Sequence, residues 1–126
     1  RSDFVDRMRE RLRVLPDSFW TTLRESSQAQ MEHYLSDVTA AVMRDDQVFY
    51  LISLAGFVQT LAYLLFSLNR RFYPGGRLLG ERIAELPELP DSFYGRFESL
   101  LRYESDLGPE QKREIAELLA KSVIAL

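Results

Sequence analysis

Cysteine is absent from this 126-residue chain, and histidine occurs once, as His33. Without cysteine the chain has no disulfide, no thiolate metal site and no thiol nucleophile, which favours a reducing, cytoplasmic location. A metal site needs several ligands close together, and His33 has no second histidine or cysteine at ligand spacing. We therefore expect no metal or cofactor in this chain and an ordinary surface or half-buried position for His33.

An excess of positive charge is also missing. The formal net charge is −3, and lysine occurs only at Lys112 and Lys121. Non-specific binding to a phosphate backbone needs a dense field of lysine and arginine, so general nucleic-acid binding is not expected. The acidic total still leaves room for a local basic site.

Recognisable catalytic motifs are lacking as well. Pro74-Gly75-Gly76 follows an expected helix rather than a strand and matches neither the dinucleotide nor the Walker spacing. No nucleophile-elbow sequence is present. Asp45-Asp46 precedes an expected helix, where carboxylates favour the positive end of the helix dipole, so we assign this pair to capping. The isolated chain is expected to have no catalytic activity.

No segment shows the alternation of a β-strand, and the pattern predicts an all-α fold. Helical spacing and cap signals predict helices near residues 2–13, 19–42, 48–68 and 78–86, then from residue 91 and from Pro109. We expect residues 1–126 to form a single up-and-down bundle of four to five helices. Because the chain begins Arg1-Ser2-Asp3, without methionine or a targeting signal, we also expect it to be an excised or processed part of a longer protein.

The central segment, residues 48–68, carries no charged side chain and is long enough to cross a bilayer. Small and polar residues interrupt it every three or four positions, which draws a stripe down one side of the helix. The stripe consists of Ser53, Gly56, Thr60, Tyr63 and Ser67. Lipid would not favour such a stripe, whereas a neighbouring helix could approach it closely. We therefore expect a core helix with neighbours on most sides, and no membrane span.

A dense group of polar side chains follows this helix: Asn69, Arg70, Arg71, Tyr73 and Arg77. Cations complement the negative end of a helix and asparagine is common near helix ends, which would explain much of the group without a ligand. Alternatively, an arginine pairs with a phosphate or carboxylate while Asn69 and Tyr73 donate or accept hydrogen bonds. Both interpretations stay open, and these five residues are the candidate substrate-binding residues.

The run of residues 63–75, with Leu86-Pro87 and Leu89-Pro90 after it, resembles a bacterial family of helical domains of unknown function. In that family the domain follows a nucleotidyltransferase domain of the polymerase-β type. Its layout is similar to the helical half of aminoglycoside nucleotidyltransferases such as the kanamycin enzyme. The resemblance is clearest over residues 48–101, and its core is the word Leu-Asn-Arg-Arg-Phe-Tyr-Pro. Arg77 stands where the family often has lysine.

This resemblance implies an accessory substrate-binding or lid domain of a nucleotidyltransferase. Its partners would be the N-terminal catalytic domain, which would hold nucleotide and Mg²⁺, and a small-molecule substrate. The helix layout is also similar to the HEPN ribonucleases, but Arg24 and His33 are too far apart for the Arg–His motif of that family. The alternative function is a non-enzymatic interaction or dimerisation module, in which apolar faces left over from the bundle pair between two copies.

Overall fold

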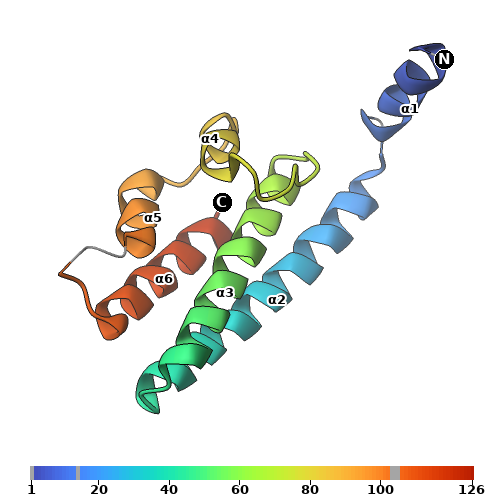
Figure 1. Cartoon of the computed structure of the whole chain (residues 1–126). Coiled ribbons are helices and arrows are strands. Elements are labelled where there is room, and N and C mark those ends of the chain that lie inside the picture. Colours follow the sequence, from blue (N-terminus) through green and yellow to red (C-terminus); the bar gives the residue numbers. More distant parts are fainter. Residues whose placement is uncertain (1, 14, 103–105) are drawn as a thin grey trace.

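The computed structural model describes residues 2–13, 15–102 and 106–126, and every regular element in them is a helix. The helices are α1 (Ser2–Arg13), α2 (Asp17–Met43), α3 (Gln47–Leu68), α4 (Leu79–Ala84), α5 (Phe93–Leu101) and α6 (Pro109–Ile124). The predicted all-α class is confirmed. The six helical segments predicted from the sequence are all present, and the number of helices in the bundle is within the expected four to five. Five of them, α2 to α6, pack into a bundle, and α1 lies outside it (Figure 1).

The two longest helices, α2 and α3, form an antiparallel hairpin that is the framework of the bundle (Figure 1). Their connection is short because α2 ends at Met43 and Asp46 caps α3. The Asp46 carboxylate accepts a hydrogen bond from the Phe49 backbone N–H at 3.1 Å. The capping role predicted for the acidic pair is therefore confirmed, with Asp46 as the capping residue.

The ring of Tyr34 of α2 packs directly against Gly56 of α3. A Cβ atom at this position would lie 2.3 Å from Cε1 of Tyr34, so only glycine leaves room for that ring. Thr60, one turn further along, satisfies its hydroxyl within the helix by donating to the Gly56 carbonyl at 2.8 Å. The stripe of small residues therefore admits a neighbouring helix, as predicted.

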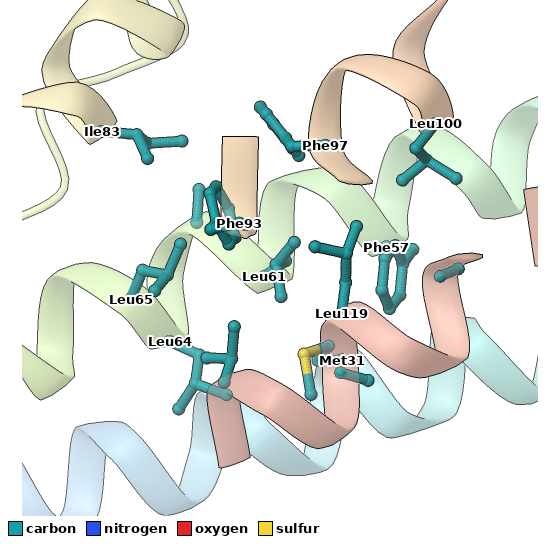
Figure 2. Packing of buried hydrophobic residues seen from close by; sticks show 14 of the residues in the cluster. Met31, Phe57, Leu61, Leu64, Leu65, Ile83, Phe93, Phe97, Leu100 and Leu119 are labelled. Carbon is teal, nitrogen blue, oxygen red and sulfur yellow. The ribbon is translucent and has the colours of Figure 1, made fainter. Parts of the chain in front are cut away.

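Helices α4, α5 and α6 close the core over the hairpin (Figure 2). Leu119 of α6 reaches Met31 of α2 and Leu61 of α3, and the rings of Phe93 and Phe97 of α5 stack at 5.2 Å above them. Burying each large apolar side chain contributes roughly 1.5–3 kcal/mol. The core is concentrated around the second half of α3.

The first half of α3 is less covered than expected. Leu51 is 66% exposed and Ile52 is 61% exposed, although both belong to the uncharged segment predicted to have neighbours on most sides. This prediction is wrong for the first half because the described helices pack mainly against its second half. Within the described residues, Gln47–Leu68 is the one helix long and apolar enough to cross a membrane, and half of its most apolar window is buried.

Helix α1 projects away from the bundle and packs against no other helix of the described chain (Figure 1). Its apolar residues Phe4, Val5 and Met8 are all exposed. Within the described residues, this apolar face of α1 therefore has no partner.

Candidate functional site

The candidate residues begin where α3 ends, at a turn built around a left-handed residue. Asn69 is the C-cap, and Arg70 follows with φ of 53°. The Arg71 N–H donates to the Phe66 carbonyl at 2.9 Å, and the Arg70 N–H donates to the Ser67 carbonyl at 3.1 Å. This is the Schellman arrangement, in which glycine usually occupies the left-handed position. The left-handed conformation costs an arginine about 1–2 kcal/mol of backbone strain.

Asn69 uses its side-chain amide to hold a distant segment in place. Its Nδ2 donates to the Leu65 carbonyl at 2.9 Å and to the Glu88 carbonyl at 3.0 Å, while its Oδ1 accepts from the Glu88 N–H at 2.8 Å. These contacts fix the segment between α4 and α5 against the end of α3. Asn69 therefore positions the backbone of Glu88 beside the candidate residues.

Arg70 lines a cavity of about 440 Å³ between α2, the end of α3 and the end of the chain, which we call the polar cavity. Its charged lining residues are Arg24, Glu25, Arg70 and Glu88, and Gln28 adds an amide. The Arg70 guanidinium also forms an ion pair with Asp17 at 2.5 Å. Both side chains of this pair are largely exposed, so it contributes at most about 1 kcal/mol.

Arg71 and Tyr73 line a different cavity of about 450 Å³, which we call the aromatic cavity. Phe19 of α2, Tyr63 of α3 and Phe72 supply its other rings. The rings of Tyr63 and Tyr73 meet edge to face with centroids 4.5 Å apart. The aromatic cavity thus combines several ring surfaces with one guanidinium.

The side chains of Trp20 and Phe72 pack against each other where the two cavities adjoin. Trp20 lines the polar cavity, Phe72 lines the aromatic cavity, and the two ring centroids are 5.4 Å apart. The five candidate residues therefore do not converge on one ligand position. Arg70 belongs to one cavity, and Arg71 and Tyr73 belong to the other.

Arg77 lies apart from both cavities. It is exposed beyond the turn at Gly75, whose φ of 99° is one that side chains other than glycine rarely adopt. Within residues 15–102 and 106–126, no hydrogen bond or ion pair joins Arg77 to another residue. Its guanidinium is open to solvent.

The sequence analysis missed the contribution of α2 to both cavities. Arg24 and Gln28 line the polar cavity, and Ser27 lines the aromatic one. The available signal was Ser27, a polar residue at helical spacing between Leu23 and Met31, which the structure buries. Only the packing of α2 beside the end of α3 gives these residues a shared role with the arginines.

His33 is exposed, as predicted, and its Nε2 lies 3.4 Å from a carboxylate oxygen of Asp37. Across the described residues, no group of three or more histidine, aspartate or glutamate side chains is arranged to hold a metal ion.

Comparison with known proteins gives one family match. A family described as "Domain of unknown function (DUF4037)" matches residues 1–77, which include α1, α2, α3 and all five candidate residues. Neither the curated proteins nor the solved structures contain a match to the chain.

Proposed function

We infer the role of this chain, which belongs to the DUF4037 family of domains of unknown function, from the residues that line the polar cavity. The proposal is an accessory substrate-binding or lid domain of a bacterial nucleotidyltransferase, which does not catalyse the reaction alone. The observation that carries it is the presence of two guanidiniums and two carboxylates around one cavity, from Arg24, Arg70, Glu25 and Glu88. The similarity of helix layout to the helical half of aminoglycoside nucleotidyltransferases supports it.

The chemistry of the polar cavity suits a ligand with many hydroxyl and amino groups. Glu25 and Glu88 can accept hydrogen bonds from ammonium groups, while Arg24 and Arg70 can donate to hydroxyl oxygens. The volume is within the range of small-molecule sites, roughly 300–1,000 Å³. An aminocyclitol therefore matches the lining better than a purely anionic ligand would, and nucleotide and Mg²⁺ are assigned to the catalytic domain.

Helix α1 supports the proposal of a partner domain. A helix of 12 residues is marginal in water when it packs against nothing, and α1 has Phe4, Val5 and Met8 exposed. Contact with another domain would bury this face and stabilise the helix. We assign that contact to the proposed nucleotidyltransferase domain.

The test is a thermal-shift titration of the chain with kanamycin. We expect kanamycin to raise the Tm of the natural chain, because a ligand that binds only the folded state stabilises it by about 2.7 kcal/mol at a hundred times its Kd. Arg70→Ala should abolish the shift while leaving the Tm without ligand almost unchanged, since its ion pair is exposed.

Arg77→Ala is the matched control, because Arg77 lies outside both cavities. This variant should keep the full shift. An unchanged shift in Arg70→Ala, or no shift in the natural chain, would reject the polar cavity as an aminocyclitol site. A large loss of stability in Arg70→Ala would favour the structural interpretation of the arginine.

A second candidate function, a homodimer, is favoured by the exposed first half of α3. Val48, Leu51 and Ile52 are each more than 60% exposed and lie within two turns of one helix. Self-association would bury them. Light scattering should then show a dimer that Leu51→Glu converts to a monomer, whereas a monomeric natural chain would exclude this candidate.

A further inference from the structure

The aromatic cavity has its own chemistry, distinct from that of the polar cavity. We propose that it binds a planar aromatic ring carrying a carboxylate or phosphate group, with Arg71 as the anion partner. The proposal is independent of the proposed function, because the two cavities share no lining residue.

The rings are the first argument. Phe19, Tyr63, Phe72 and Tyr73 all line the cavity. Phe72 is 46% exposed despite lying 6.1 Å, centroid to centroid, from Phe19. Aromatic surfaces favour other rings in stacked or edge-to-face geometry, so a planar ligand gains more here than an aliphatic one of equal area.

The charge is the second argument. Among the nine described residues that line the cavity, Arg71 is the only charged one. Within the described chain no ion pair engages its guanidinium, in contrast to Arg70, which pairs with Asp17. A guanidinium beside an apolar surface binds carboxylate or phosphate through two parallel hydrogen bonds. A cationic ligand would instead be repelled.

Helix α2 supplies further polar groups. Ser26 and Ser27 are consecutive, Gln30 lies about one turn further along, and Ser27 is only 3% exposed. Hydroxyl and amide groups at the edge of an otherwise aromatic site supply orientation rather than charge. The volume of about 450 Å³ accommodates one or two fused rings with an anionic group.

Isothermal titration of the chain with four probes tests the proposal. Indole-3-acetate and adenosine monophosphate present a carboxylate and a phosphate, and tryptamine and adenosine are their matched controls without negative charge. We expect the anions to bind and the controls to bind about tenfold or more weakly. The tighter of the two anions identifies the preferred combination of ring and anionic group.

Two arginines of the same segment provide the matched variants. Arg71→Gln should weaken binding of the anions about tenfold or more, whereas Arg77→Gln, with the same change of charge at an exposed residue outside both cavities, should leave it unchanged. Phe72→Leu, which keeps the apolar character but removes a ring, should also weaken it. The proposal is overturned if neither anion binds at millimolar concentration, if tryptamine binds as tightly as indole-3-acetate, or if both arginine variants behave alike.

The two proposals fail separately. Loss of the kanamycin shift concerns Arg70 and the polar cavity, and loss of indole-3-acetate binding concerns Arg71 and the aromatic cavity.

Discussion

Gly56 leaves room for the ring of Tyr34 between α2 and α3. Gly56→Ala would place a Cβ 2.3 Å from Cε1 and 2.4 Å from Cδ1 of Tyr34, so either the ring or a whole helix must move. Overpacking of this kind costs typically 1–3 kcal/mol. We expect Gly56→Ala to lower the free energy of unfolding by about that amount, measured by urea denaturation.

Gly95 provides the control for that substitution. It lies inside α5, and a Cβ there would meet no atom within 4 Å. Gly95→Ala should therefore stabilise the chain by about 0.5–1 kcal/mol, because alanine loses less conformational freedom in a helix. Equal effects of the two substitutions would contradict the close packing of Gly56 against Tyr34.

Arg70 carries backbone strain that glycine would relieve. Its φ of 53° costs an L-residue about 1–2 kcal/mol, and alanine would bear the same cost. Arg70→Gly and Arg70→Ala lose the same ion pair with Asp17, so their difference isolates the strain. We expect the glycine variant to have the higher Tm, by a margin equivalent to about 1 kcal/mol.

Neither Arg70 variant should bind kanamycin, whatever its Tm. If the glycine and alanine variants melt together, Arg70 does not occupy the left-handed conformation in solution. A gain of stability with a loss of binding would indicate that arginine is kept at this position for its guanidinium.

At the level of whole elements, Asn69 joins the end of α3 to the segment between α4 and α5. Its amide makes both contacts with the backbone of Glu88, and Glu88 lines the polar cavity. Asn69→Ala leaves these backbone groups without their partner, at a cost of about 1–3 kcal/mol. We expect a lower urea midpoint together with weaker kanamycin binding.

Asn69→Asp distinguishes the hydrogen bond that the Asn69 side chain accepts from those that it donates. It keeps an oxygen that can accept from the Glu88 N–H but loses the donor to the Glu88 and Leu65 carbonyls. Its stability should fall between those of the natural chain and Asn69→Ala. If Asn69→Ala is as stable as the natural chain, the Asn69 amide does not hold the segment between α4 and α5 in place.

The helices could be predicted largely from local signals, because caps and periodicity are properties of neighbouring residues. Residues 15–20 and 89–94 both read Leu-Pro-Asp-Ser-Phe followed by an aromatic residue, and they show both the success of such local signals and their limit. In each, the phenylalanine N–H donates to the proline carbonyl, from Phe19 to Pro16 and from Phe93 to Pro90. Yet α2 begins at Asp17 and α5 begins only at Phe93, after Ser92 in a left-handed conformation.

The two cavities could not be predicted in the same way. Arg70 and Arg71 are adjacent in sequence, and they line different cavities because the chain turns in a left-handed conformation at Arg70. No glycine at that position indicates the turn in the sequence. The cavity walls come from α2, more than forty residues earlier, and depend on the register between α2 and α3. That register is set by contacts such as Gly56 against Tyr34, which a local pattern does not specify.

In the molecule as a whole, the core and the apolar surface occupy different places. Phe57, Leu61 and Leu65 of α3 are buried, whereas Leu51 and Ile52 of the same helix are exposed. The stability of the bundle therefore depends on the second half of α3 together with α2, α5 and α6. The exposed first half and α1 remain accessible to partners.

Deletion of residues 1–13 tests this division directly. Because α1 packs against no other described helix, the shortened chain should melt at the same temperature as the natural one, followed by circular dichroism at 222 nm. Leu119→Ala, which removes a fully buried side chain, is the control and should cost about 2–5 kcal/mol. Amide hydrogen exchange should agree, with fast exchange in α1 and slow exchange around Phe57 and Leu61. A marked fall in the Tm on deletion would show that α1 packs against the bundle in solution, and its exposed face would then no longer be free for a catalytic domain.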